Sequence, residues 1–320
     1  GCRGLVADPE CHDQEPRMNT ETPQDFNGFH SGFVALVGAP NAGKSTLLNR
    51  MLGEKVSITS RKPQTTRNRI LGIVHRPTSQ LVLIDTPGVH RTQQPLNVRI
   101  VDTALSALGD VDLILLIVDP LHPDREAENF LLSRLPEAGK PVILAVNKID
   151  RLTPDQLIET LDRWSTRLAF HQVVPISALQ GTQVEDLLGV MEGMLPEGPP
   201  FYAEDMLTDS AERFIVAEMI REKVFRLTGE EIPYATAVTV DVFKETRPGK
   251  MVRITATIHV ERDSQKGMVI GRGGKKLKQI GQAAREDIEK LLGTKVYLEL
   301  FVRVQKNWSR DTRALRKFGY

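Results

Sequence analysis

The 320-residue sequence predicts an α/β domain with a mostly parallel sheet and helices on both faces, followed by a smaller α+β domain. Between residues 33 and 146, three apolar runs each end at a glycine-rich or polar motif. This pattern is typical of buried parallel strands that carry ligand-binding loops at their carboxyl ends. Beyond residue 208, two β-rich runs lie between helical segments, which indicates a second domain.

The first apolar run, residues 33–37, leads into the letters GAPNAGKS at residues 38–45, which form a phosphate-binding loop. Gly38 and Gly43 let backbone N–H groups face the β-phosphate, Lys44 reaches the β- and γ-phosphates, and the Ser45 hydroxyl ligates Mg²⁺. A helix expected at residues 46–52 adds the attraction of its N-terminal dipole. The residues expected to contact nucleotide here are Gly38, Ala39, Pro40, Asn41, Ala42, Gly43, Lys44, Ser45 and Thr46.

The second apolar run, residues 81–84, is followed by Asp85, Thr86, Pro87 and Gly88. We expect Asp85 to hold Mg²⁺ through water and the Gly88 N–H to sense the γ-phosphate as a switch hinge. The polar loop at residues 61–67 could complete the Mg²⁺ shell with a threonine hydroxyl. Thr66 is chosen because it is similar to the second threonine of the TTR pattern in related GTPases.

The third apolar run, residues 141–146, ends at Asn147, Lys148, Ile149 and Asp150, and this motif selects the base. The Asp150 carboxylate can accept two N–H bonds from guanine, whereas adenine offers no matching pair of donors. The motif resembles that of Ras-like GTPases, which implies that Asn147 and Lys148 brace the loop and flank the base. The same resemblance implies that Ser177 and Ala178 contact the guanine oxygen. The sequence therefore predicts binding and hydrolysis of GTP.

Val89 follows Gly88, at the position where Ras-like enzymes carry a glutamine that orients the attacking water. A valine cannot hold a water molecule, so we expect slow hydrolysis that depends on another group, a partner or a cation. Asn41 resembles an asparagine that ligates K⁺ beside the phosphates in a related family, although it could equally be a turn residue. The expected catalytic residues are Lys44, Thr66, Gly88 and Asn41, and Val89 is counted among the nucleotide contacts.

The N-terminal residues 1–30 are expected to be a flexible extension, with Met18 as a plausible start. Both cysteines, Cys2 and Cys11, lie in this stretch, so no buried disulfide framework is expected and a reducing compartment is favoured. No apolar run reaches the length of a membrane span. These features predict a cytoplasmic protein.

The net charge of +1 conceals a strong asymmetry. Residues 247–320 contain 18 Lys and Arg against 7 Asp and Glu, a net charge of +11, so residues 1–246 carry −10. A basic C-terminal region on an acidic body indicates a polyanionic partner.

The letters MVIGRGGK at residues 268–275 resemble the GXXG loop of a KH domain, which clamps about four nucleotides of single-stranded RNA. Gly271 and Gly274 remove side chains so that phosphates can approach the backbone, and Arg272, Lys275 and Lys276 supply charge. Gly273 completes the loop. The expected RNA-binding residues are Gly271, Arg272, Gly273, Gly274, Lys275 and Lys276.

The elements around this loop follow the order of a type II KH domain. We expect a helix at residues 212–227 with one apolar face, strands at 235–243 and 251–260 with a turn at 247–250, a helix before the GXXG loop, a helix at 275–292 and a strand at 295–304. Trp308 and Phe301 could stack on bases, but aromatic residues on a terminal strand more often belong to a core.

The expected domain boundaries are residues 31–196 for the GTPase domain, 197–208 for a linker, 209–308 for the KH domain and 309–320 for a tail. Prolines and glycine at residues 196–200 favour a stiff linker.

Taken together, the nucleotide motifs and the KH order resemble the Era family of bacterial GTPases over nearly all of residues 18–320. The stretch at residues 60–67 and the ending at residues 313–320 are similar to this family in particular. The resemblance implies the cofactors GTP or GDP and Mg²⁺, binding near the 3′ end of 16S rRNA, assembly of the 30S ribosomal subunit, and peripheral association with the cytoplasmic membrane. We expect a monomer.

Two alternative functions stay open at this point. The basic domain could bind anionic lipid, because Lys275, Lys276 and Lys278 suit either target, and this would make the protein a switch at the membrane surface. Alternatively, the chain could be an RNA-binding assembly factor whose nucleotide is never hydrolysed, for which Val89 gives some support.

Overall fold

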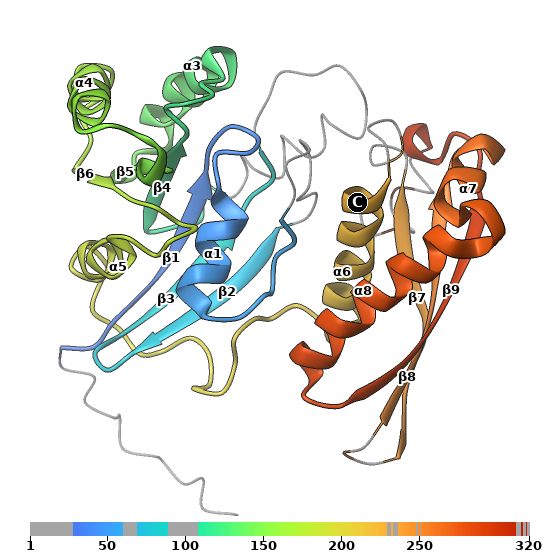
Figure 1. Ribbon diagram of the computed structural model, residues 1–320. Helices are drawn as coiled ribbons and strands as arrows, with labels where there is room; N and C mark the ends of the chain where they lie inside the picture. The colour runs from blue at the N-terminus through green and yellow to red at the C-terminus, as the bar shows by residue number, and fades with distance from the viewer. Residues whose placement is uncertain are drawn as a thin grey trace, which may run out of the picture.

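A computed structural model of the chain describes residues 28–59, 69–88, 108–228, 232, 236–247, 249, 251–311, 315 and 318. The described residues form one sheet of six strands and one of three. Each sheet has its own helices and occupies its own half of the molecule (Figure 1). The predicted fold class, a mostly parallel α/β domain followed by a smaller α+β domain, is confirmed.

The six-stranded sheet has the order β2-β3-β1-β4-β5-β6. Its strands are β1 (His30–Val37), β2 (Ile70–Arg76), β3 (Ser79–Asp85), β4 (Leu113–Val118), β5 (Val142–Val146) and β6 (Gln172–Pro175). Only β2 is antiparallel to its neighbour, β3. The carboxyl ends of the five parallel strands therefore lie along one edge, where open α/β sheets bind their ligands.

Helices cover both faces of this sheet (Figure 1). They are α1 (Lys44–Leu52), α3 (Arg125–Arg134), α4 (Pro154–Ser165) and α5 (Val184–Glu192). Successive side chains of a strand point to opposite faces. Accordingly, Val34 and Leu36 of β1 pack in the core beneath α1 and α5, whereas Ala35 and Val37 pack in the core that includes residues of α3 and α4. Burial on both faces explains why these strands read as continuous apolar runs.

The second domain has the predicted order of elements. They are α6 (Glu212–Leu227), β7 (Ala237–Arg247), β8 (Met251–Val260), α7 (Asp263–Ile270), α8 (Lys275–Leu292) and β9 (Lys295–Val304). Strands β7 and β8 are antiparallel, and β8 and β9 are parallel. The predicted bounds of α6, β8, α8 and β9 are confirmed. Strand β7 extends to Arg247, which was expected in the turn, because it pairs with Met251 of β8.

Helix α6 differs from the prediction of a single apolar face. Every residue from Ile215 to Phe225 is buried, including Glu218, Arg221 and Glu222. The helix lies on the side of its domain that faces the first domain (Figure 1). The charged stripe of α6 is therefore covered by neighbouring elements and not by water.

Residues 197–207 run along the first sheet and are hydrogen-bonded to it. The Gln80 side chain accepts hydrogen bonds from the amides of Phe201 and Tyr202, at 2.7 and 3.0 Å, and donates to the Tyr202 carbonyl at 2.8 Å. Further along, the amide of Ile73 donates to the Leu207 carbonyl at 2.9 Å. The linker is therefore anchored on the first domain almost to the start of α6.

The two aromatic residues weighed as core candidates differ from each other. Trp308 is fully buried and packs edge-on against Phe318 of the tail, with ring centroids 5.1 Å apart. Phe301 is 56% exposed, on the face of the β7-β8-β9 sheet opposite to the helices. The expectation of a core position is confirmed for Trp308 and wrong for Phe301, because β9 buries only its alternate residues.

Candidate nucleotide and RNA sites

Helix α1 begins immediately after the phosphate-binding loop and leaves its N-terminus open. Gly43 precedes it with a positive φ of 107°, and a Cβ atom on Gly43 would lie 2.1 Å from Nδ2 of Asn147. No side chain caps the helix and its first turn contains no acidic residue. The backbone N–H groups and the positive end of the helix dipole are therefore available to an anion.

Lys44 is buried within this loop, with 6% of its surface exposed. Its Nζ donates to the carbonyl oxygens of Gly38 and Ala39, at 3.0 and 2.9 Å. Burial lowers the pKa of Lys44 to about 8, although the negative charge of Asp85 acts in the opposite direction. A bound phosphate would favour the charged form of the amine and raise its pKa. Protonation of Lys44 is therefore expected to accompany the binding of an anionic ligand at high pH.

Oxygen atoms suited to Mg²⁺ meet at the end of β3. The fully buried carboxylate of Asp85 accepts hydrogen bonds from the hydroxyls of Ser45, at 2.6 Å, and Ser57, at 2.8 Å. Carboxylate and hydroxyl oxygens are the hard ligands that Mg²⁺ prefers, so these residues fit the predicted metal. The neighbouring Thr86 hydroxyl donates to the Leu36 carbonyl at 2.7 Å, which ties this motif to β1.

Gly88 lies against the phosphate-binding loop, because a Cβ atom on it would come within 2.8 Å of the Cα of Pro40. A larger residue would therefore push the two loops apart. Pro87 joins Thr86 to Gly88 in the same segment, and Thr46 lies in the first turn of α1. Thr66 and Val89 lie outside the described residues, so their roles stay predictions.

Asn147 connects three of the predicted motifs. Its Nδ2 donates to the Ala42 carbonyl at 2.8 Å, and its Oδ1 accepts from the amides of Lys148 and Ala178, at 2.8 and 2.9 Å. The side chain is 2% exposed. A single buried amide thus joins the phosphate-binding loop to both loops predicted to contact the base.

The predicted base-contacting residues converge on the same region. The Ser177 hydroxyl donates to Oδ1 of Asp150 at 2.6 Å, and the Ile149 amide donates to the Ile176 carbonyl at 3.2 Å. The Asp150 carboxylate remains exposed. It is therefore oriented by Ser177 and accessible to a ligand.

Lys148 has a left-handed backbone, with φ of 66°, and its amine bridges two segments. Nζ donates to Oδ2 of Asp119 at 2.5 Å and to the Asn41 carbonyl at 2.9 Å. Asn41 also has a positive φ, 64°, and is exposed at the tip of the loop. Asn41 thus lies at the surface of the phosphate-binding loop, and its contact with K⁺ stays a prediction.

Several contributing residues were not predicted. Asp119 follows the apolar strand β4, so the rule that located the other motifs would have found it. Arg50 donates from Nε to the Ala178 carbonyl at 3.3 Å, which supports a base-contacting loop. Ser57 precedes the polar loop and carries no motif of its own.

The GXXG loop lies between α7 and α8. Gly271, Gly273 and Gly274 all have positive φ, and a Cβ atom on Gly273 or Gly274 would have nothing within 4 Å. Helix α8 begins with no side-chain cap and no acidic residue in its first turn. Arg272 and Lys275 are exposed beside this open N-terminus, and Lys276 is half-buried. The loop offers backbone N–H groups and positive charge to an extended polyanion.

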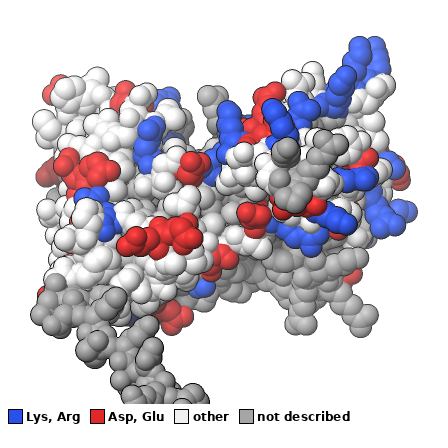
Figure 2. Space-filling view, turned by 90° about the horizontal axis from the view of Figure 1, so that it is seen from below, with Lys and Arg blue, Asp and Glu red and all other residues white. Residues whose placement is uncertain are grey.

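The surface charge follows the predicted asymmetry. In Figure 2, basic side chains predominate over the half formed by the second domain, whereas acidic side chains are more frequent over the first domain. The α8 lysines and Arg272 therefore lie on a domain whose overall charge is positive, and this charge favours polyanionic partners.

The six-stranded sheet carries the phosphate, metal and guanine motifs, and the second domain has a GXXG loop in the type II order of elements. This combination defines a P-loop GTPase with a KH domain. Residues 33–148 match the profile described as "50S ribosome-binding GTPase", and residues 231–309 match the profile described as "KH domain". The GTPase Era of Geotalea uraniireducens is 54% identical over 292 residues, which cover 91% of this chain and 98% of the relative. The chain belongs to the Era family of GTPases.

Other relatives agree. The GTPase Era of Geobacter metallireducens is 54% identical over 92% of this chain and 99% of its own. Two solved structures have TM-scores of 0.87 and cover 91% of this chain and 99% of their own. One is Era in complex with MgGDPNP and nucleotides 1506–1542 of 16S ribosomal RNA, at 39% identity, and the other is a variant of Aquifex aeolicus Era bound to GDP·AlF4⁻, at 38%.

These matches establish GTP hydrolysis as the activity, with GTP or GDP and Mg²⁺ as ligands. The reading in which nucleotide is never hydrolysed is thereby excluded. Across the described residues, none of the helices combines the length and the apolar character that crossing a membrane would need.

Proposed function

We propose that this chain is a GTP-dependent switch that binds the 3′ region of 16S rRNA through its KH domain during assembly of the 30S subunit. The observation that carries the proposal is the uncapped N-terminus of α8, which directly follows a loop with three glycines of positive φ. The same chain contains the nucleotide motifs described above. A relative of the same architecture was crystallised with a 16S rRNA segment, which supports the choice of RNA.

We assign the residue roles as follows. Lys44 contacts the β- and γ-phosphates, Ser45 and Asp85 hold Mg²⁺, and Asp150 accepts the guanine N–H groups. Mg²⁺ supplies charge that stabilises the transferred phosphoryl group. Thr66 completes the metal shell, and the Gly88 amide reports the γ-phosphate. The domains are assigned to residues 31–196 and 209–308, with 197–208 between them and 309–320 as the tail.

Hydrolysis requires a means of orienting water that Val89 does not supply. We assign this assistance to K⁺ held beside the phosphates by Asn41, whose exposed side chain lies at the tip of the phosphate-binding loop. Turnover should therefore be faster in K⁺ than in Na⁺, and Asn41→Ala should abolish the difference. Equal turnover of the unmodified protein in the two salts would contradict the assignment.

The RNA target is tested by crosslinking the protein to RNA in cells and sequencing the attached RNA. We expect one peak near the 3′ end of 16S rRNA that disappears in Gly273→Asp. Scattered crosslinks that the variant does not change would show that the basic domain is a general polyanion surface.

We assign the protein to the cytoplasm as a monomer, with a peripheral fraction at the inner membrane. The exposed α8 lysines support electrostatic contact with anionic lipid. Flotation with vesicles containing anionic lipid should recover a fraction that neutral vesicles do not recover. Sedimentation of the free protein should give a single species of 35.7 kDa.

A further inference from the structure

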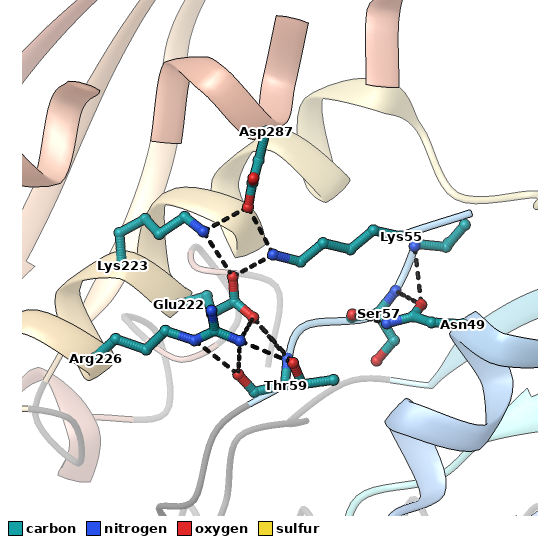
Figure 3. A network of polar contacts seen from close by, with 9 residues as sticks. Asn49, Lys55, Ser57, Thr59, Glu222, Lys223, Arg226 and Asp287 are labelled. Atoms are coloured by element: carbon teal, nitrogen blue, oxygen red, sulfur yellow. Dashed lines mark hydrogen bonds and ion pairs between the residues drawn. The ribbon is translucent and has the colours of Figure 1, made fainter. Parts of the chain in front are cut away.

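A five-residue segment of the first domain, from Lys55 to Thr59, makes noncovalent contacts with the second domain. It follows α1 and lies against the helix that carries Glu222 and Arg226 in the second domain (Figure 3). Its middle residue, Ser57, is fully buried and donates to the Asp85 carboxylate at 2.8 Å. The segment therefore touches the carboxylate assigned to Mg²⁺ without belonging to any predicted nucleotide motif.

The first domain holds the middle of the segment through Asn49 of α1. Oδ1 of Asn49 accepts from the amides of Val56 and Ser57, at 3.0 and 2.9 Å, and its Nδ2 donates to the Ser57 carbonyl at 2.6 Å. These bonds involve only the backbone of the segment, and the Ser57 hydroxyl and both ends of the segment have other partners.

A single carboxylate of the KH domain, Glu222 of α6, holds both ends (Figure 3). Its Oε2 accepts from Lys55 Nζ at 2.5 Å, and its Oε1 accepts from the Thr59 amide at 2.9 Å. Arg226 contacts Glu222 at 3.0 Å and also donates to the Thr59 carbonyl at 3.0 Å. The segment is thus clamped across its length by one helix of the other domain.

The Glu222 side chain is fully buried, so it can hold Lys55 as an ion pair only if it is ionised inside the protein. Burial alone would raise its pKa, but the hydrogen bond and charge of Lys55, the Thr59 amide and the charge of Arg226 bring the pKa below the ordinary value. The carboxylate is therefore ionised at neutral pH. Removing its charge would take the Glu222 partner away from Arg226 and leave Lys55 paired with Asp287 alone.

Helix α8 joins the clamp through Asp287. Its Oδ2 accepts from Lys55 Nζ at 2.7 Å and from Lys223 of α6. Asp287 lies 12 residues after Lys275, the first residue of α8 after the GXXG loop, which corresponds to about 18 Å along one helix. The clamp therefore includes residues of both α6 and α8 of the KH domain.

We propose, building on the nucleotide and magnesium placement given above, that Glu222 is a positioning residue for the GTPase site. It acts through Ser57: the KH domain clamps the segment from Lys55 to Thr59, and this clamp keeps the Ser57 hydroxyl on Asp85. A residue of the RNA-binding domain then supports the nucleotide site through Ser57 without itself contacting the nucleotide or the metal.

The test measures dissociation of a fluorescent GDP from the full chain over a range of Mg²⁺ concentrations. Glu222→Gln preserves the shape of the side chain but removes its charge, and we expect dissociation in Mg²⁺ to become about five- to tenfold faster. Ser57→Ala should have a similar effect, and the double variant should be no faster than Ser57→Ala alone, because both act on Asp85. Additive effects would overturn the route through Ser57.

Lys55→Met provides a second variant on a partly exposed side chain, in case Glu222→Gln does not fold. It should accelerate dissociation in the same direction, and hydrogen exchange of residues 53–59 should increase in both variants. The matched control is Arg253→Gln, which breaks an ion pair with Glu299 inside the KH sheet and should leave dissociation within about twofold of normal.

Normal dissociation in both Glu222→Gln and Lys55→Met would overturn the proposal, while leaving the assigned function intact if the unmodified protein binds GDP in a Mg²⁺-dependent manner. Failure of the unmodified protein to bind GDP would instead overturn the nucleotide assignment itself.

Discussion

The helices α1 and α8 begin in the same way but have different surroundings. Each follows a glycine of positive φ, Gly43 or Gly274, lacks a side-chain cap and has no acidic residue in its first turn. Around α1 the space is closed, since a Cβ on Gly43 would collide with Asn147. Around α8 it is open, since a Cβ on Gly274 would meet nothing within 4 Å.

We therefore expect the surroundings of the two helix ends, and not the ends themselves, to select the ligand. Lys44 is buried and held by backbone carbonyls at α1, which suits one compact phosphate group of fixed geometry. Lys275 is exposed at α8, which suits a chain of phosphates that enters and leaves the site. Four changes test this contrast.

The largest effect is expected from Gly43→Ala. The added methyl group displaces Asn147, which connects the phosphate-binding and base-contacting loops, so GDP affinity should fall by about 100-fold or more. Gly274→Ala is the matched control: it meets no atom and costs only about 1–2 kcal/mol of stability for the left-handed backbone. Titration with fluorescent GDP should separate the two, and equal GDP affinities would refute the contrast.

Gly273→Asp should have the next largest effect, on RNA alone. Aspartate tolerates positive φ and open space surrounds this position, so the fold should survive. Its carboxylate repels the phosphates that approach α8, and affinity for a single-stranded RNA from the 3′ end of 16S rRNA should fall about tenfold. Fluorescence anisotropy measures the RNA affinity, and GDP affinity should remain unchanged. A matching loss of GDP affinity would show that the variant is misfolded.

The pKa of Lys44, about 8 in the free protein, predicts that nucleotide affinity depends on pH. Phosphates favour the charged amine and raise this pKa, so above pH 8 binding must take up a proton that the free protein has lost. GDP affinity should therefore fall about tenfold between pH 7 and pH 9. Calorimetry in buffers of different ionisation enthalpy should show proton uptake at pH 9 and none at pH 6. A flat profile would contradict the lowered pKa of Lys44.

The smallest effect is expected from Lys275→Ala. One exposed lysine on an open surface contributes a single phosphate contact, so RNA affinity should fall about threefold and the salt dependence should decrease in slope by about 0.7. RNA titrations at several salt concentrations measure both quantities. An unchanged slope would mean that Lys275 does not contact a phosphate.

Local patterns predicted those parts of the fold and site that are continuous in the chain. The bounds of α6 and α8 follow from helical spacing, and Lys44, Asp85 and Asn147 lie in motifs at strand ends. Ser57 could not be found in this way, because it meets Asp85 across 28 residues of sequence and carries no motif.

Glu222 illustrates the same limit over a longer range. It meets Thr59 across 163 residues, and in the sequence it belongs to a charged stripe that reads as a solvated helix face. Only the packing of the first domain against α6 brings Lys55 and Thr59 to the Glu222 carboxylate. Phe301 shows the opposite error, because apolar character alone does not say which side of an edge strand is covered.

The anchored linker determines how far the domains can separate. Because the Leu207 carbonyl is bonded to Ile73, only residues 208–211 remain between that anchor and α6, a leash of about 14 Å when extended. So short a tether keeps Glu222 at an effective concentration in the millimolar range relative to the segment it clamps. Contacts that are individually weak are then sufficient to keep the segment clamped.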